Sequence, residues 1–495
     1  MGLSWEGVRS WPSGRLTWAL VAGWFVLAFL DFPIPFLDDI CYGAPAIEVA
    51  NGHGPMIPWS AYYLERFGGH SCYPPYYAYL LGGWLKVFGV TTASFLFFMS
   101  TCGAAVTLAF AYWIRRWKLP TWTEAVAALL FVILLPTRGF RPDLCGFALF
   151  AVGAWMEAGG GGPRKLAGTL LIFASVATLP FLGVLALPLF LYRFAEGFLL
   201  PDRALRNARW GALALRLAVA GAVTGFLFLA MIGFHLEPFW TNFKGNAEDT
   251  VNLLGSIYLH NLFRSPGIFL RLVVFPALFF TGAACYLVSA YREFARSGDG
   301  PGKVAFSLRL GAVLLALGLI VRGIAVSSAG LALFDLICCF GAVAVAGWAW
   351  KLGRRTVAVG LTAAVCGLYL LACWQIVNWI FCKPPNPANL AAIRQELEAE
   401  PPDLIQIDMS ALRYLYDYRL PPNARDSVFT DFDYAQWQQL TPEQRHGQKR
   451  VWVVNAVSLT YYDAYKNDPR IEPVRLFGVK IPHCVRNGAE LFLLK

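Results

Sequence analysis

Long apolar runs recur along the first 380 residues of this chain, and they constrain its fold more than any other feature. A helix of about 20 apolar residues crosses the ~30 Å hydrocarbon core of a bilayer. The composition agrees, because 57% of the residues are hydrophobic and only 15% are charged. The sequence therefore predicts a polytopic α-helical membrane protein with about eleven transmembrane helices. The expected spans are 16–32, 92–114, 121–136, 144–158, 165–179, 180–194, 211–233, 267–290, 305–321, 329–350 and 356–380.

Basic residues gather in short segments between these spans, and they carry most of the formal net charge of +10. Such segments stay on the cytoplasmic side of a membrane. The basic excess therefore sets the topology, and we expect no nucleic-acid partner. Arg9 and Arg15 precede the first span, which lacks a cleavage site and is expected to be retained. These features predict a plasma-membrane protein with a cytoplasmic N-terminus.

The composition changes after Cys382, where a proline-rich linker at 383–387 ends the last span. Short helical and strand patterns alternate beyond it, which predicts a small α/β domain. The expected helices are 388–400 and 434–445, and the expected strands are 404–407, 451–455 and 491–494. We thus divide the chain into a transmembrane module at 1–382 and an extracytoplasmic α/β domain at 383–495.

A long segment at 31–91 is expected on the outer side of the membrane, with an interfacial helix over 76–87. Cys41 and Cys72 flank part of it, and Cys382 and Cys484 bracket the C-terminal domain. Two disulfides are compatible with an oxidising compartment, but the spacing alone does not decide between paired and free thiols.

An acidic pair, Asp38-Asp39, directly follows the first span. Ionised carboxylates beside a bilayer are costly and usually serve binding or chemistry. Two adjacent carboxylates repel each other, which tends to raise the pKa of one of them. The alternative to a functional role is a solvated carboxylate that caps a helix beside the membrane.

Several short motifs follow this pair in a fixed order. They are Asp38-Asp39, Asn51-Gly52, Tyr73-Pro74-Pro75-Tyr76-Tyr77, Phe88-Gly89 and Arg141-Pro142-Asp143. The ordered set resembles that of the GT-C integral-membrane glycosyltransferases, in particular the family 39 relatives of protein O-mannosyltransferases. Bacterial aminoarabinose and galacturonic-acid transferases belong to this group. The resemblance is detailed over residues 16–160 and architectural beyond them.

The resemblance implies a sugar transfer from a polyprenyl-phosphate donor to an acceptor hydroxyl, with inversion at the anomeric carbon. Such chemistry needs a carboxylate that takes the acceptor proton, and we assign this role to Asp38. Asp39 would orient Asp38 or hold the acceptor, and Asp143 is a second acidic candidate. The departing lipid phosphate needs cations, for which the candidates are Arg138, Arg141, Lys244, His260, Arg264 and Arg322. The alternative for each cation is a side chain that reaches for lipid headgroups.

The acceptor or sugar would contact polar and aromatic residues of the outer segment, namely Glu48, His53, Tyr73, Tyr76 and Tyr77. These aromatic residues also suit an interfacial belt. A lipid monophosphate leaving group does not require a divalent cation, so we expect no essential metal and no cofactor. The expected partners are the lipid-linked donor, an envelope lipid, glycan or protein acceptor, and membrane lipids.

Two other classes of protein remain possible on the sequence. A multi-pass transporter or lipid flippase would share the spans, but the chain shows no internal duplication. A membrane-anchored scaffold would leave Asp38, Asp39 and Asp143 without a purpose.

Overall fold

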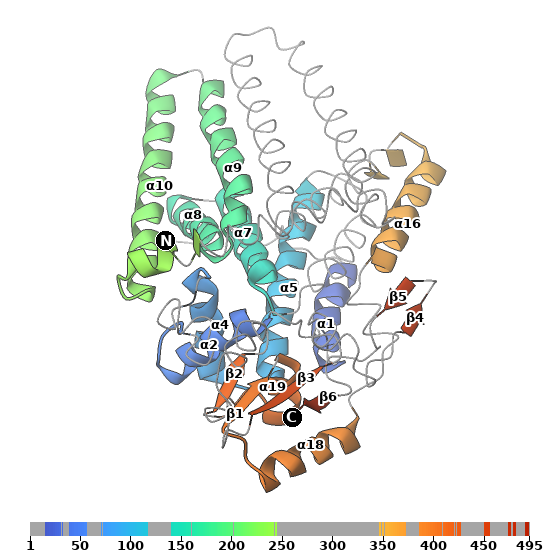
Figure 1. Cartoon of the computed structure of the whole chain (residues 1–495). Helices are drawn as coiled ribbons and strands as arrows, with labels where there is room; N and C mark the ends of the chain where they lie inside the picture. Colours follow the sequence, from blue (N-terminus) through green and yellow to red (C-terminus); the bar gives the residue numbers. More distant parts are fainter. Residues whose placement is uncertain are drawn as a thin grey trace.

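The computed structural model is mostly helical (Figure 1). It describes residues 15–30, 32, 39–56, 71, 73–116, 140–159, 161–200, 202–241, 243–244, 346–347, 349–350, 352–372, 386–407, 409–419, 421, 423–426, 450–455, 474–476, 479–481 and 491–494. Element labels follow Figure 1.

Six expected spans coincide with helices. They are α1 (Arg15–Phe29), α5 (Thr92–Arg116), α7 (Pro142–Ala158), α8 (Gly162–Thr178), α10 (Arg203–Met231) and α16 (Arg355–Ala372). The expected span at 180–194 is composite, with α9 (Gly183–Ala195) between the 3-10 turns η4 (Pro180–Leu182) and η5 (Glu196–Leu199). Among the described residues, three helices are long and apolar enough to cross a membrane: Thr92–Ala109, Pro180–Leu199 and Arg203–Met231. The expected spans at 121–136, 267–290 and 305–321 lie outside the described residues, as does most of 329–350.

Glycines allow the helices to pack closely. A Cβ on Gly153 of α7 would lie 2.8 Å from the Gly168 carbonyl oxygen of α8, so only glycine permits this approach. Small residues at helix contacts serve the same purpose in other membrane proteins. Between α1 and α5, Gly103 makes room for the buried Trp24 ring, and the Trp24 indole donates a hydrogen bond to the Thr107 hydroxyl (3.0 Å).

The segment at 31–91 contains a helix that the sequence analysis did not anticipate. This helix, α2 (Ile40–Asn51), begins directly after the acidic pair and packs on α4 (Pro75–Phe88). It ends because Gly52 adopts the left-handed conformation, with φ of 91°. Helix α4 confirms the expected helix at 76–87 and approaches α2 closely, since a Cβ on Gly82 would lie 2.7 Å from the Ala46 carbonyl oxygen.

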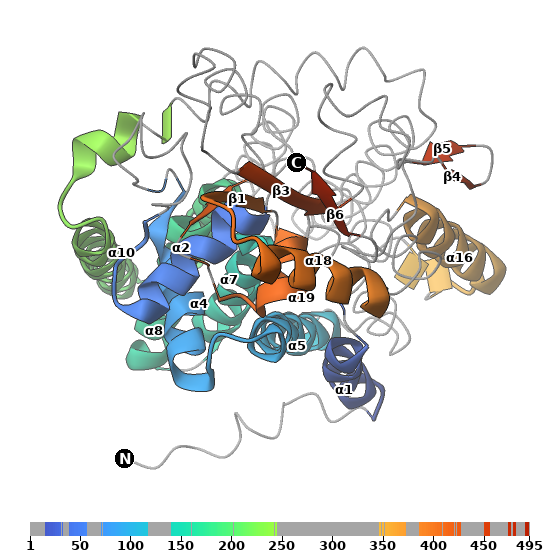
Figure 2. The same cartoon turned by 60° about the horizontal axis from the view of Figure 1, so that its bottom comes forward.

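The C-terminal residues form a sheet with two helices on one face (Figure 2). The strands lie in the order β2 (Ala424–Asp426), β1 (Leu404–Ile407), β3 (Arg450–Asn455) and β6 (Leu491–Leu494). Strand β1 pairs in parallel with β2 and β3, and β6 pairs antiparallel with β3. The helices are α18 (Pro387–Ala399) and α19 (Met409–Tyr416), and strands β4 (Val474–Leu476) and β5 (Val479–Ile481) form a separate hairpin. The expected elements at 388–400, 404–407, 451–455 and 491–494 are thus present, whereas the expected helix at 434–445 lies outside the described residues.

This C-terminal unit packs into the same apolar core as the helical bundle. Tyr418 is fully buried, and its ring stacks on Phe95 of α5 with centroids 4.3 Å apart. The Asp417 carboxylate accepts hydrogen bonds from the backbone N–H and the hydroxyl of Thr92 (3.2 and 3.1 Å), the first residue of α5. One cluster of buried side chains therefore runs from α1 and α5 to the sheet.

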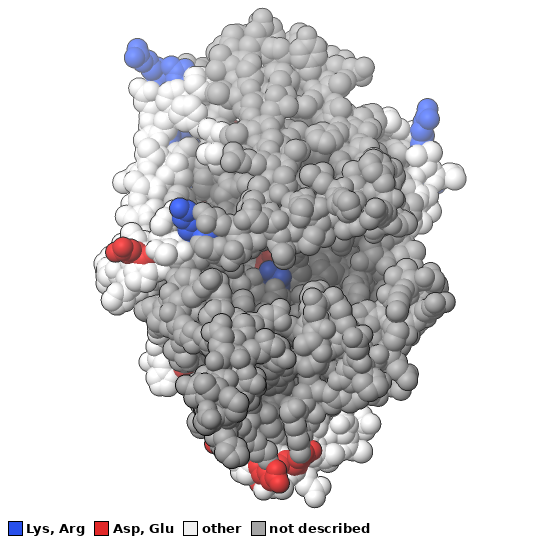
Figure 3. Space-filling view, in the orientation of Figure 1, with Lys and Arg blue, Asp and Glu red and all other residues white. Residues whose placement is uncertain are grey.

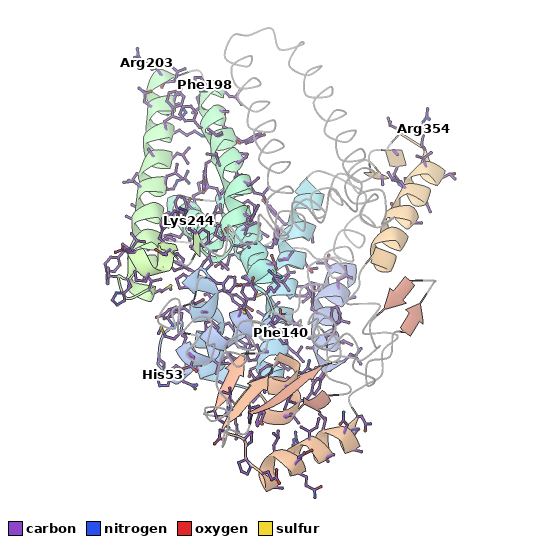
Figure 4. All side chains as sticks on the ribbon, in the orientation of Figure 1. His53, Phe140, Phe198, Arg203, Lys244 and Arg354 are labelled. Carbon is purple, nitrogen blue, oxygen red and sulfur yellow. The ribbon has the colours of Figure 1, made fainter. Side chains whose placement is uncertain are left out.

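The two ends of the molecule carry different side chains. Arg203 and Arg354 lie at one end, and His53 and Phe140 lie toward the other (Figure 4). In the space-filling view, basic side chains mark the upper corners of the described surface and acidic ones mark its lower tip (Figure 3). Phe140 and the sheet thus lie away from Arg203 and Arg354 (Figures 1 and 4).

The Tyr418–Phe95 contact gives a testable expectation for stability. Truncating a buried aromatic side chain costs about 3–5 kcal/mol, because the cavity it leaves is not refilled. We expect Tyr418→Ala to lower the thermal unfolding temperature of the detergent-solubilised protein markedly. The partly exposed Tyr414, four residues earlier on α19, is the matched control, and Tyr414→Ala should have a much smaller effect. Equal losses from both substitutions would contradict the docking role of Tyr418.

Candidate active site at the start of helix α7

The backbone of Phe140 is held at its N–H and at its carbonyl by residues of two motifs from the segment at 31–91. The Asp39 carboxylate, just before α2, accepts a hydrogen bond from the Phe140 N–H (2.8 Å). The Tyr77 hydroxyl of α4 donates a hydrogen bond to the Phe140 carbonyl oxygen. All three residues are buried. Because buried backbone groups need partners, this grip fixes the chain where it enters α7.

The grip places Arg141 and Asp143 directly beside it. Arg141 is the N-cap of α7, Pro142 occupies the first helical position, and Asp143 lies in the first turn. Proline is preorganised for this position, and an acidic side chain in the first turn is favoured by the helix dipole. The Arg141 guanidinium lies 3.8 Å from the Asp143 carboxylate, measured from Nε to Oδ2.

Aromatic residues hold the Arg141 guanidinium in place. Its Nη2 donates a hydrogen bond to the Tyr42 hydroxyl (2.8 Å), and its Cζ lies 5.0 Å from the centre of the Tyr42 ring. Tyr42, on α2, in turn packs on Tyr73, with ring centroids 4.4 Å apart. A guanidinium held on an aromatic ring loses little freedom when it binds an anion.

The site thus combines two buried carboxylates with one guanidinium. Asp39 and Asp143 are buried, whereas the side chain of Arg141 is partly exposed. Burial raises the pKa of the neighbouring Tyr77 well above its usual range, and the charges of Asp39 and Asp143 add to this shift. Tyr77 therefore remains a neutral hydrogen-bond donor.

The C-terminal unit packs against the Phe140 side chain of this site. The Phe140 ring contacts both Phe95 (5.3 Å between centroids) and Tyr418 (6.3 Å). Burial also raises the pKa of Tyr418 far above that of a free tyrosine, and Arg413 offsets part of this shift. The residues that bind the Phe140 backbone and those that pack on its ring thus come from distant parts of the sequence.

Other expected site residues lie away from this centre. Glu48 lies nine positions beyond Asp39 on the chain, which corresponds to about 14 Å along α2. It pairs with His53 (2.8 Å), which follows the turn at Gly52. Tyr76 donates to the Thr224 carbonyl oxygen of α10 (3.0 Å) and thereby ties α4 to the bundle.

His53 also lines a small cavity of about 220 Å³ together with Ser71, Tyr79, Met231, His235 and Phe239. The exposed Lys244 lies well apart from Phe140 (Figure 4). The structure therefore brings together Asp39, Tyr73, Tyr77, Arg141 and Asp143, and it places Glu48, His53, Tyr76 and Lys244 elsewhere.

The remaining candidates cannot be placed. Asp38, Arg138, His260, Arg264 and Arg322 lie outside the described residues, as do Cys72, Cys382 and Cys484 of the possible disulfides. Within the described part of the chain, no three His, Cys, Asp or Glu side chains come together as a metal site would require.

Sequence reasoning missed Tyr42, Phe140 and Tyr418. Tyr42 lies one helical turn beyond the acidic pair, which is a signal that becomes visible once α2 is recognised. Phe140 and Tyr418 contribute a backbone group and a packed ring, and no local pattern distinguishes them from other aromatic residues.

Comparisons with known proteins address the fold. No protein-family model matches the sequence, and no curated protein sequence matches it either. The structure is similar to the crystal structure of an oligosaccharyltransferase from Archaeoglobus fulgidus in its apo form. The TM-score is 0.50 at 13% sequence identity, and the similarity covers 91% of this chain and 71% of the archaeal one.

At this level of identity the likeness concerns the fold alone. It supports the expected GT-C fold at the coarse level. Membership of family 39, the number of spans and a separate C-terminal domain stay predictions.

The grip on Phe140 can be tested by a double-mutant cycle. Asp39→Asn weakens the hydrogen bond to the Phe140 N–H, and Tyr77→Phe leaves the buried Phe140 carbonyl without its donor, at a cost of about 1–3 kcal/mol. Because both changes act on the backbone of one residue, their effects on unfolding free energy should be non-additive by about 0.5 kcal/mol or more. Tyr79→Phe is the matched control, since the Tyr79 hydroxyl bonds the Met231 carbonyl instead (3.3 Å). Strict additivity of Asp39→Asn with Tyr77→Phe would refute the grip.

Proposed function

We propose that the protein is an inverting glycosyltransferase that moves a sugar from a polyprenyl-phosphate donor to an acceptor hydroxyl at the outer face of the membrane. The observation that carries this proposal is the meeting of buried carboxylates and a held guanidinium in one cluster at the start of α7. The fold likeness to an oligosaccharyltransferase supports the same class of chemistry. Transport or lipid flipping would not explain why these side chains meet there.

In this reaction, the carboxylate and the cation act on different groups. The acceptor oxygen attacks the anomeric carbon, and the bond from that carbon to the phosphate oxygen breaks. A carboxylate takes the acceptor proton as the new bond forms. The electron pair leaves with the polyprenyl phosphate, whose growing negative charge needs a nearby cation.

We assign the proton-accepting role to Asp38, which directly precedes Asp39 in the chain. Asp39 is a positioning residue in this proposal, because its contact with the Phe140 N–H supports the geometry of α7. Arg141 is the cation for the leaving phosphate, since a planar guanidinium suits bidentate phosphate contacts. Asp143 orients Arg141 and balances its charge before the donor binds.

Removing the proton acceptor should stop the transfer without disturbing the fold. We expect Asp38→Asn to lower the transfer rate by about 100-fold or more, a typical contribution of a general base, while membrane insertion is unchanged. Mass spectrometry of envelope glycans from cells with the wild-type or variant chain measures the product. Glu398→Gln removes one negative charge from the exposed face of α18 and serves as the control. Normal product from Asp38→Asn would reject the assignment of the base.

The proposal also predicts independence from divalent metals. The departing group is a lipid monophosphate that a guanidinium can neutralise, so transfer by the purified protein should persist in excess EDTA. A loss of transfer that Mg²⁺ or Mn²⁺ restores would show that a cation takes part. Arg141→Gln should reduce transfer in the same assay with and without EDTA, whereas Arg141→Lys should recover part of it.

A further inference from the structure

A second polar cluster lies at the end of the bundle where the basic segments gather. A cavity of about 750 Å³ opens between the end of α7, the start of α8, the α9–η5 junction and α10. Its charged lining consists of Glu157, Lys165, Arg193, Glu196, Arg209 and Arg216. None of these residues has a part in the proposed sugar transfer.

The cavity has more positive than negative charge. Four cationic side chains and two carboxylates line it, which leaves an excess of two positive charges. Arg216 pairs with Glu157 (3.3 Å), and Arg193 pairs with Glu196 (3.0 Å). Arg209 also contacts Glu196, which therefore serves two guanidinium groups.

Part of this cluster lies deep along α10. Arg216 is 13 positions beyond Arg203, or about 20 Å along the helix axis, and the Glu157 side chain that it meets is only 1% exposed. Charged side chains at such a depth are costly and usually serve a function. A merely structural network would be expected to balance its charges, and this one does not.

The walls of the cavity suit a lipid. Apolar side chains, including Leu166, Leu213, Leu215 and Val219, line it beside the charged groups. Few residues of α10 are buried, so most of the helix surface faces away from the protein. In a bilayer, the cavity would thus open toward acyl chains while its cations face a headgroup.

Specific packing keeps the cavity open. Gly153 and Gly168 bring α7 against α8 at the level of Glu157, and the Thr169 hydroxyl of α8 donates to the Glu157 carboxylate (3.3 Å). On the other side, the Trp210 indole stacks on Phe194 (4.8 Å between centroids) and donates to the Phe194 carbonyl oxygen (3.0 Å). These contacts hold α7 against α8 and the end of α9 against α10, and they thereby fix the walls of the cavity.

We propose that this cavity binds the headgroup of a phospholipid with two negative charges. The excess of two positive charges sets the charge of the ligand, and arginine suits its phosphates. Basic pockets between transmembrane helices on the cytoplasmic side bind such headgroups. The proposal is independent of the sugar transfer at the opposite end of the bundle.

The test measures lipid binding by native mass spectrometry of the full chain in phosphatidylcholine nanodiscs with added cardiolipin or phosphatidylglycerol. We expect retained cardiolipin, which carries two phosphates, to exceed phosphatidylglycerol, which carries one. Lys165→Gln combined with Arg209→Gln should weaken cardiolipin binding about tenfold or more, since each basic residue contributes about 1 kcal/mol.

The matched control removes the same charge outside the cavity. Arg203→Gln combined with Arg354→Gln alters two basic residues that lie toward the same end of the molecule (Figure 4) and do not line the cavity. We expect this variant to bind cardiolipin like the wild type. Equal weakening by both pairs would overturn the proposal in favour of general surface attraction.

Inorganic phosphate distinguishes a lipid from a soluble anion. The proposal predicts that millimolar phosphate leaves bound cardiolipin in place, and displacement by phosphate would overturn it. If the double variant fails to fold, Lys165→Gln compared with Arg203→Gln provides the same contrast with one charge each. The readout does not depend on sugar transfer, so its failure would leave the proposed function standing.

Discussion

Phe140 is the residue at which Asp39, helix α4 and helix α7 meet. Its N–H is bound by Asp39 and its carbonyl by Tyr77, so residues of the segment at 31–91 fix the backbone where α7 begins. Arg141 and Asp143 follow within three residues, and their positions depend on the backbone of Phe140. The ring of the same residue rests on Phe95 and Tyr418. Backbone and side chain of one residue thus join the parts of the candidate active site.

The bundle keeps two kinds of charge cluster at its two ends. At one end, the Arg141 guanidinium lies beside the buried Asp143 carboxylate and the Tyr42 ring. At the other, arginines outnumber carboxylates around a larger cavity. The first arrangement suits a reaction in which a proton and a phosphate are handled together, whereas the second suits the retention of an anion. The length of α7 separates them, because Asp143 lies in its first turn and Glu157 lies near its end.

Much of the architecture could be predicted from the sequence, because apolar runs and β-rich segments are local signals. The spans at α5, α8 and α10 and the strands β1, β3 and β6 follow such patterns. Helix α2 was missed because its short alanine-rich stretch is interrupted by Pro45 and lies in a segment rich in turn residues. Arg141 and Asp143 could be selected from their motif, but the role of Asp39 depends on a backbone group 101 residues away. Contacts between residues so far apart in the sequence leave no periodic pattern in it.

The position of Tyr418 in the chain has a consequence for biosynthesis. The helices around the candidate site are translated first and can enter the bilayer one after another, whereas this tyrosine is made hundreds of residues after Phe95. Until it arrives, the rings of Phe95 and Phe140 lack their final neighbour. The ribosome must therefore finish most of the polypeptide before Tyr418 can pack on these rings. The candidate site is then completed only after its helices have been inserted.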